Sequence, residues 1–383
     1  MKIMQNCLLL LILLMSGACT TEEAAVSKDE TIKEDTSEPE NQDFTPEAEL
    51  YVGGFSIAWG MDWLPNGDML VTEKAGKLYR VRNGEIVGEI TGLPEVKQQG
   101  QGGLMDVKVH PDYANEPWIY LTFASPAGGG SGANTSLMRA QLSDNSLTDV
   151  EILYKAEPNT TRGQHFGSRV EFDNEGYLYF SVGDRGQRDL NPQDIYRDNG
   201  KIYRLTEDGK VPADNPFVGQ QSAVEAIFSY GHRNPQGMAK NPTSGEIWTH
   251  EHGPKGGDEI NIIRKGNNYG WPEISYGVNY NGTSFTDKTE APGMEQPVWY
   301  WVPSIAPSGM AFVDSDRYPG WDGDLLIGSL KFGYLMYCDV EGDEVKSEKP
   351  FFEGIGRVRA VEQGPDGYIY FSVEGKGIYR IVD

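Results

Sequence analysis

The stretch FDNEGYLYFSVGDRG, residues 172–186, followed by GKIYRL at 200–205, is the pattern that decides the fold of this chain. A polar turn containing glycine precedes a run of alternating side chains, and a second turn leads to a second such run. Alternation with a period of two, bounded by turn residues, is typical of the two strands of a β-hairpin. The stretch therefore predicts an antiparallel β unit.

Five further passages repeat this arrangement of turns and strands along the chain. They cover residues 64–81, 110–142, 241–266, 321–340 and 365–382. Six units of sheet placed around an axis close into a ring that leaves no long edge strand exposed. The repeats therefore predict an all-β fold, a six-bladed β-propeller with four-stranded antiparallel blades and long inserted loops at the face that bears the site. A β-sandwich would need fewer and more evenly spaced strands.

The start of the chain, residues 1–18, has the composition of an export signal. Lys2 precedes the apolar run LLLLILLM, and the small residues SGA lead to Cys19. A charged start, a short apolar core and a small-residue cleavage site describe a secretory signal, and the run is far shorter than the roughly 20 residues that span a bilayer. SGAC is similar to a bacterial lipoprotein box, although Ser16 replaces its usual aliphatic residue. We therefore expect an exported, periplasmic or cell-surface protein with a lipid anchor at Cys19; plain secretion is the alternative.

The next segment, residues 19–49, is expected to be an acidic disordered tether. Its last 30 residues hold eleven acidic residues and two lysines with no apolar periodicity, and such a segment repels itself and cannot bury a core. The folded domain is expected over residues 50–383, in which the single cysteine, Cys338, should pack as a small apolar residue. The net charge of -24 argues against nucleic acid as a partner, because nucleic-acid-binding proteins carry basic patches.

The loops that interrupt the repeats carry a candidate acid–base pair. His165 lies in GQHFGSR, just before a strand, and Asp184 ends that strand. A hairpin-like return would bring the Asp184 carboxylate to the histidine ring, where it would fix the tautomer and raise the basicity. The alternative is a loop histidine that bonds a backbone carbonyl. The other histidines expected in these loops are His232, His250 and His252.

Cationic and amide side chains stand in other loops. Arg233 and Asn234 occur in YGHRNPQG (230–237), where the guanidinium offers a planar fork of donors to an anionic or carbonyl-rich ligand; a buried arginine paired with an acid is the alternative. Gln101 lies in GQGGL, whose glycines allow a ligand to approach the backbone closely. The remaining cations, Lys331, Arg357 and Arg359, are either part of the same site or scattered surface charges. If these cationic and amide side chains lie together at one site, they would suit a small, flat, multiply anionic organic ligand.

Seven motifs occur in one order along the chain: GQGGL, HFGSR with VGD, GHRNPQG, HGPKGGDEINIIRKGNNYGWP, PSIAPSG, SLK and RVR. In this order they resemble the motifs of the soluble quinoprotein sugar dehydrogenases, and the resemblance runs from about residue 50 to the end. That family consists of six-bladed propellers that bind pyrroloquinoline quinone (PQQ) and calcium and oxidise aldose sugars at C1. The resemblance therefore implies a PQQ-dependent aldose sugar dehydrogenase.

The resemblance also implies a role for each matching residue. His165 would take the proton from the C1 hydroxyl, with Asp184 as its orienting acid, while hydride passes from C1 to C5 of the quinone and leaves a lactone. Arg233 would stabilise negative charge on the C5 oxygen. The cofactor contacts would come from Gln101, Arg233, Asn234, Tyr280, Ser304, Lys331, Arg357 and Arg359, with plain loop packing as the alternative for the tyrosine. Electrons would then pass to an external acceptor.

The segment HEHGPKGGDEINIIRKGNNYGWP (250–272) raises the question of a metal. Its two histidines look at first like zinc ligands. Zinc favours tetrahedral nitrogen and sulfur ligands, but residues two apart on a strand point to opposite faces, so HEH is a poor chelate. Calcium takes oxygens, including main-chain carbonyls. In the family pattern, the carbonyls of Gly253 and Pro254 match ligands of the calcium that also binds the quinone and polarises its C5 carbonyl. Glu259 and the carbonyl of Tyr269 match a second, structural calcium.

Three positions depart from the best-known glucose dehydrogenases of the family. Gln164 replaces an acid, His252 a glutamine and Val302 an aromatic residue. Together with the shorter chain, these changes place the resemblance nearer the aldose sugar dehydrogenase branch, which accepts many sugars, and imply a monomer. Two other functions stay open. One is a non-catalytic propeller lipoprotein that binds a glycan or a protein. The other is a calcium-dependent lactone hydrolase, which would need carboxylate and asparagine ligands at the axis.

Overall fold

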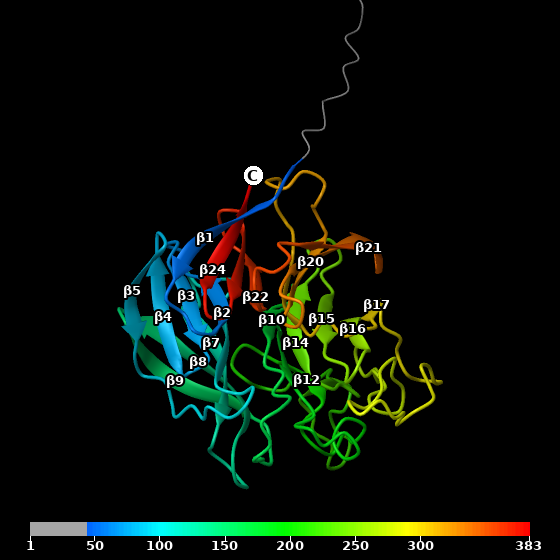
Figure 1. Ribbon diagram of the computed structural model, residues 1–383. Helices are drawn as coiled ribbons and strands as arrows, with labels where there is room; N and C mark the ends of the chain where they lie inside the picture. Colours follow the sequence, from blue (N-terminus) through cyan, green and yellow to red (C-terminus); the bar gives the residue numbers. More distant parts are fainter. Residues whose placement is uncertain (1–43) are drawn as a thin grey trace, which may run out of the picture. The chain divides into compact units, whose positions relative to one another are not determined.

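The computed structural model describes residues 44–383, which form six four-stranded antiparallel sheets (Figure 1). Blade 1 contains β2 (Ala58–Trp63), β3 (Met69–Glu73), β4 (Lys77–Arg82) and β5 (Glu85–Ile90). Blade 2 contains β6 (Leu104–Val109), β7 (Trp118–Ser125), β8 (Asn134–Ser143) and β9 (Ser146–Lys155). Blade 3 contains β10 (Val170–Phe172), β11 (Leu178–Val182), β12 (Lys201–Leu205) and β13 (Ile227–Tyr230).

The remaining blades follow in chain order. Blade 4 contains β14 (Pro235–Lys240), β15 (Ile247–Glu251), β16 (Asp258–Ile262) and β17 (Trp299–Trp301). Blade 5 contains β18 (Pro307–Phe312), β19 (Leu325–Ser329), β20 (Leu335–Glu341) and β21 (Glu344–Phe351). Blade 6 contains β22 (Val358–Gln363), β23 (Ile369–Val373), β24 (Gly377–Val382) and, from the other end of the chain, β1 (Glu47–Gly53).

The first strand of each blade lies at the centre of the molecule. β2, β6, β10, β14, β18 and β22 each contact the first strand of the next blade, and β22 contacts β2 again, so the contacts run around a closed circle. The predicted six-bladed propeller with four-stranded antiparallel blades is therefore confirmed. The repeated sequence passages correspond to the two middle strands of each blade, such as β11 and β12 in blade 3.

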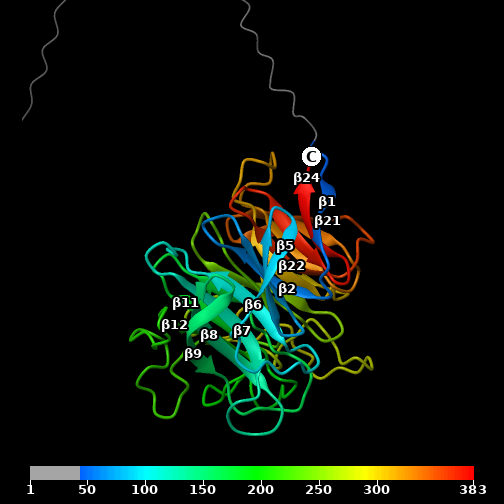
Figure 2. The same ribbon diagram turned by 90° about the vertical axis from the view of Figure 1, so that its left-hand side faces the viewer.

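The ring closes through the two ends of the described chain. β1 pairs antiparallel with β24, with Glu47 opposite Val382 and Gly53 opposite Gly377. Figures 1 and 2 both place β1, in blue, directly beside β24, in red. Residues 47–49, which the sequence analysis placed in the acidic tether, are part of this strand. Residues 47–49 contain two glutamates and therefore resemble the acidic tether in composition, but they pair with β24 as part of a strand.

The hydrophobic core lies between neighbouring blades. One cluster joins Trp248 and Ile260 of blade 4 to Phe312 and Leu325 of blade 5, and the Trp248 and Phe312 rings meet edge to face at 5.4 Å. Such aromatic pairs add stability beyond the area that they bury. Cys338 is fully buried in the same cluster as a free thiol, as the sequence predicted.

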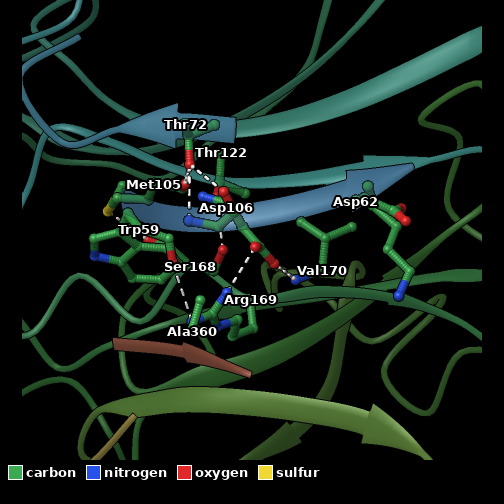
Figure 3. Close-up of polar contacts among 12 residues, drawn as sticks. Trp59, Asp62, Thr72, Met105, Asp106, Thr122, Ser168, Arg169, Val170 and Ala360 are labelled. Carbon is green, nitrogen blue, oxygen red and sulfur yellow. Dashed lines mark hydrogen bonds and ion pairs between the residues drawn. The ribbon is translucent and has the colours of Figure 1, made fainter. Parts of the chain in front are cut away.

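A buried arginine ties the inner strands together near the axis. Arg169 donates from Nη1 to Asp106 Oδ1 on β6 at 2.8 Å (Figure 3) and from Nε to the Gln236 carbonyl on β14 at 2.8 Å. Its Nη2 reaches the carbonyls of Trp59 at 3.3 Å and Arg359 at 3.1 Å. One guanidinium therefore bonds strands of four other blades, and loss of one member of such a buried pair is strongly destabilising.

The described part of the chain contains no helix, and so no helix long and apolar enough to cross a membrane. The predicted signal segment and most of the predicted tether, with Cys19, lie outside the described residues.

Candidate active site

Two adjoining cavities open among the loops that connect the blades. The smaller, of about 630 Å³, is lined by His165, Asp184 and Arg233 among others. The larger, of about 930 Å³, is lined by a set that includes Ser304, Lys331, Arg357 and Arg359. Gln101, Pro254 and Tyr280 line both. Residues far apart in the sequence are thus brought to one composite site.

The smaller cavity contains a hydrogen-bonded histidine and aspartate. Asp184 follows β11, and its Oδ1 lies 2.6 Å from His165 Nδ1. Two further donors hold the carboxylate: the main-chain N–H of Gly186 at 2.6 Å and the indole N–H of Trp271 at 2.9 Å. Because Nδ1 is engaged by Asp184, Nε2 is the ring nitrogen left to meet a molecule in the cavity. The predicted return of the chain does bring these two residues together.

The electrostatics of this pair favour a neutral ring. Burial and the nearby Arg233 guanidinium lower the pKa of His165 below its usual 6.5, although Asp184 opposes them. Burial works against the Asp184 carboxylate, but its bond to His165 holds the pKa of Asp184 below the ordinary value. A neutral imidazole oriented by an ionised carboxylate is the arrangement that a general base needs near neutral pH.

Arg233 borders the same cavity and is itself held by main-chain oxygens. Its Nη1 donates to the carbonyls of His252 at 2.8 Å and Gly253 at 2.7 Å. Its main-chain N–H donates to Glu251 Oε2 at 2.5 Å. Glu251 also bonds the His232 ring at 2.9 Å. No role was predicted for Glu251, because its position between two histidines suggested only a possible zinc motif.

Gln101 links the two cavities to the histidine loop. Its Oε1 accepts a hydrogen bond from the main-chain N–H of His165 at 2.7 Å. The glycines around it allow two backbones to touch: a Cβ on Gly100 would lie 2.1 Å from the carbonyl oxygen of Gly163. The close approach at these glycines joins two backbone segments of the protein, and the approach of Gln101 to a ligand stays a prediction.

The larger cavity gathers the predicted cations. Arg357 and Arg359 extend from the start of β22 to the same side and share Glu374, at 2.6 Å from Arg357 Nε and 2.7 Å from Arg359 Nη2. Lys331 Nζ donates to the Ser304 carbonyl at 2.9 Å. The lining of this cavity also includes Gln236 and His252. Sequence reasoning missed Glu374, which follows β23 and meets the arginines only through strand pairing.

Two predicted cofactor contacts are placed differently from each other. Tyr280 is 74% exposed at the border of both cavities, with its hydroxyl 3.5 Å from Arg233 Nη2. Asn234 is fully buried and lines neither cavity; its Oδ1 accepts from the Gly167 N–H at 3.1 Å, while its Nδ2 has no partner. Asn234 therefore lies behind the loop that carries the histidine.

The histidines of the segment 250–272 do not form a zinc site. Within residues 44–383 no group of three or more His, Cys, Asp or Glu side chains is placed to hold a metal ion. His250 belongs to β15, not to a loop as predicted, and its ring is fully buried against Gly237 without a hydrogen bond. His252 lines the larger cavity and bonds the Pro307 carbonyl at 2.6 Å. Burial lowers the pKa of His252 to about 3.

Oxygen atoms at the first predicted calcium position fit a hard cation. Gly253 begins a tight turn in which a Cβ would lie 2.1 Å from the carbonyl oxygen of Gly257, so carbonyls crowd together there. Asp258 fixes this turn, because its Oδ1 accepts from the Gly253 N–H and from Ser304 Oγ, each at 2.8 Å. The Gly253 carbonyl already meets the positive guanidinium of Arg233. Main-chain carbonyls beside a carboxylate are ligands that calcium accepts.

The second predicted calcium position holds two acids on neighbouring strands. Glu259 is paired with Glu251 across β15 and β16, and burial together with Glu251 raises the pKa of Glu259 to about 8. Such a pair binds a divalent cation favourably because the ion removes the repulsion. The ring of Tyr269 stacks on His232 at 4.6 Å between centroids. The donor chemistry therefore fits calcium at both positions.

Comparisons with known proteins identify the family and the relatives of this chain. The sequence profile of the Glucose / Sorbosone dehydrogenase family matches residues 55–380. The Aldose sugar dehydrogenase YliI of Escherichia coli (strain K12) is 43% identical over 319 residues, which are 82% of this chain and 85% of that protein.

Two solved structures extend the likeness to the fold. The apo-form of the soluble aldose sugar dehydrogenase from Escherichia coli is 38% identical with a TM-score of 0.83, and the match covers 88% of this chain and 99% of that one. The PQQ-bound aldose sugar dehydrogenase from Streptomyces coelicolor is 26% identical with a TM-score of 0.72, covering 88% and 98%. The match of most of the chain to the family profile and to these relatives shows that this chain belongs to the glucose/sorbosone dehydrogenase family of oxidoreductases.

Proposed function

We propose that this chain oxidises aldose sugars at C1 to lactones with PQQ and calcium as cofactors. The observation that carries the proposal is the shared wall of the two cavities: a histidine–aspartate base lies in one, four cationic side chains border the other, and Gln101 and Tyr280 line both. A sugar in the smaller cavity would thus meet a cofactor in the larger one. Relatives that are named aldose sugar dehydrogenases, one of them bound to PQQ, support the same function.

The residues of the larger cavity suit a flat cofactor with several carboxylates. Lys331, Arg357 and Arg359 supply positive charge, and the cavity volume of about 930 Å³ is in the range of organic-ligand sites. When bound, PQQ would supply the hydride acceptor, and calcium on the carbonyls of Gly253 and Pro254 would polarise its carbonyl.

The chain's own residues would carry out the proton chemistry. His165 would accept the C1 hydroxyl proton at Nε2, since Nδ1 is bonded to Asp184. The carboxylate would then stabilise the positively charged ring. Arg233, which borders the cavity beside this pair, would place positive charge where negative charge develops on the acceptor.

Reconstitution tests the proposal directly. Purified apoprotein is mixed with PQQ and Ca²⁺, desalted, and assayed by dye reduction with a panel of aldoses. Turnover is expected only with both additions, and excess chelator should abolish it. Apoprotein given PQQ and Mg²⁺ is the control for the metal. Absence of turnover with every aldose, together with no quinone absorbance after desalting, would instead favour a non-catalytic propeller that binds a glycan or a protein.

We also propose that the protein is exported and held at a membrane by a lipid on Cys19, and that it hands electrons to an external acceptor there. The sequence SGAC after an apolar run supports this location. In the Cys19→Ser protein the domain is expected to move from the membrane fraction to the soluble periplasmic or extracellular fraction, with its specific activity retained. Equal fractionation of both proteins would contradict the anchor.

A further inference from the structure

Arg185, the residue directly after Asp184, has an unusual environment. It is fully buried, yet no carboxylate within residues 44–383 forms an ion pair with it. Its guanidinium instead bonds oxygens, with the shortest contacts in one segment: Nη1 donates to the Gln164 carbonyl, and Nη2 donates to the Arg162 carbonyl at 2.8 Å. Longer bonds run from Nη2 to Thr160 Oγ1 at 3.3 Å and to the Ala133 carbonyl at 3.4 Å. The same group lies over the Phe166 ring, 3.4 Å from its centroid. Arg185 thus grips the segment that carries His165.

The backbone of His165 needs such support. Its φ is 59°, in the left-handed region, which is unfavourable for a residue with a side chain. Conformations of this kind persist where the surroundings over-determine them. Both chain neighbours of His165 are held by Arg185, Gln164 through its carbonyl and Phe166 through its ring. The guanidinium therefore fixes the peptide units on either side of the histidine.

The segment that carries His165 also bonds the segment that follows Asp184. Arg162 Nη1 donates to the Gly186 carbonyl at 2.9 Å, and the Gly186 N–H donates to Asp184 Oδ1 at 2.6 Å. The same Oδ1 bonds the His165 ring. Segments 162–166 and 184–186 are consequently cross-bonded in both directions. Asp184 holds the ring of His165, and Arg185 holds its backbone.

A purely structural need does not account for a cation at this position. Burial lowers the pKa of Arg185 to about 9, although the neighbouring Asp184 carboxylate opposes the shift, which reports the cost of burying a charge that forms no ion pair. An apolar side chain would fill the space beside Phe166 without that cost. What a guanidinium adds is a rigid fork that bonds several carbonyls at once and a positive charge close to the imidazole, which lowers the pKa of His165.

We propose that Arg185 is a positioning residue for His165, holding the histidine backbone in its left-handed conformation so that the ring is presented to the cavity between Asp184 and the substrate. This inference rests on the proposed function of His165 as the base. Unlike His165 and Asp184, Arg185 reaches neither cavity; it acts only through the histidine.

The test compares Arg185→Met, Arg185→Lys and a matched control, Arg204→Met. Arg204 is also buried and also lies over an aromatic ring, but it forms an ion pair with Asp214 and belongs to β12, away from the site. In the reconstituted Arg185→Met protein, kcat is expected to fall about 10- to 100-fold, as for a misplaced catalytic group, while the sugar KM and PQQ retention change little. Arg204→Met should lower the melting temperature but leave kcat within a few-fold.

The second measurement is the titration of His165 in the apoprotein, followed by NMR of the labelled histidine rings and assigned with the His165→Ala variant. Loss of the positive charge should raise the pKa of His165, so the acid limb of kcat/KM should move to higher pH in Arg185→Met. In Arg185→Lys, which keeps the charge but loses the fork, kcat should fall while the limb stays in place. The charged or titratable groups around this ring are Arg162, Asp184, Arg185, Arg188, Asp189, Arg233 and His252.

The outcomes separate the two proposals. An Arg185→Met protein with near-normal kcat and an unchanged His165 titration overturns the positioning role. If that variant does not fold, Arg185→Lys decides, because normal kcat in it also overturns the role. Should the titration change while His165→Ala remains fully active, Arg185 still positions the histidine, and the assignment of His165 as the base is what fails.

Discussion

The His165→Ala protein will oxidise aldoses about 10²–10⁴-fold more slowly than the parent protein, the loss expected when a general base is removed. The two charged residues beside it cannot replace it: the Asp184 carboxylate is turned toward Gly186 and Trp271, and the Arg233 guanidinium cannot accept a proton. The His165→Ala protein should still bind PQQ, because the cations of the larger cavity do not contact the imidazole ring of His165. Steady-state dye reduction with reconstituted protein, and quinone absorbance after desalting, measure the two quantities.

His110→Gln is the matched control for this change. His110 is also bonded to an acid, Glu207 at 2.9 Å, but it lines neither cavity. Its substitution should leave the sugar turnover unaltered once the protein is folded. A near-normal rate in His165→Ala would remove this residue from the catalytic role, however well the cofactor binds.

The Asp184→Asn change is expected to be almost as damaging, with kcat reduced by about 10²–10⁴-fold. An amide can donate to Nδ1, which would place the ring proton on Nε2, the atom that must accept the substrate proton. The charge of Asp184 also raises the pKa of His165. Its removal should therefore lower that pKa further and move the acid limb of kcat/KM to lower pH, opposite to the shift expected for Arg185→Met.

A pH profile of kcat/KM for the reconstituted Asp184→Asn protein measures both effects. Asp194→Asn serves as its control, since Asp194 lies in the same loop but pairs only with Arg197 at the surface. A profile that coincides with that of the parent protein would show that the carboxylate neither orients nor charges the histidine. Loss of rate without a shift of the limb would leave the orienting role and reject the electrostatic one.

The sequence predicted the middle strands of the blades and missed the inner and outer ones. The middle strands, such as β11 and β12, stand between turn signals, which mark them in the sequence. Burial does not separate them from the inner strands, because β11, β12 and the inner strand β18 are all buried along their whole length. Outer strands such as β21 are mostly exposed. β1 was missed for another reason. Its partner, β24, lies at the opposite end of the chain, and no local pattern reports such a pairing.

The same division holds for the site. Residues in glycine-rich loops with distinctive motifs, such as His165 and Arg233, could be predicted from the sequence. Glu251, Glu374 and Arg185 could not, because each gains its role from contacts across strands or between loops. Arg185 adjoins Asp184 in the motif VGD, yet nothing in the order of residues shows that its side chain turns back beneath the histidine. Such supporting residues become visible only when the packing is known.

The pairing of the first strand with the last has a consequence for how the chain is made. During synthesis β1 leaves the ribosome before the other described strands, and β24 follows all of them. Until β24 emerges, the growing chain carries unpaired edges on its first and latest sheets, and such edges invite pairing with another copy. A chain that lacks β24 would therefore be an open, self-associating product instead of a slightly smaller enzyme.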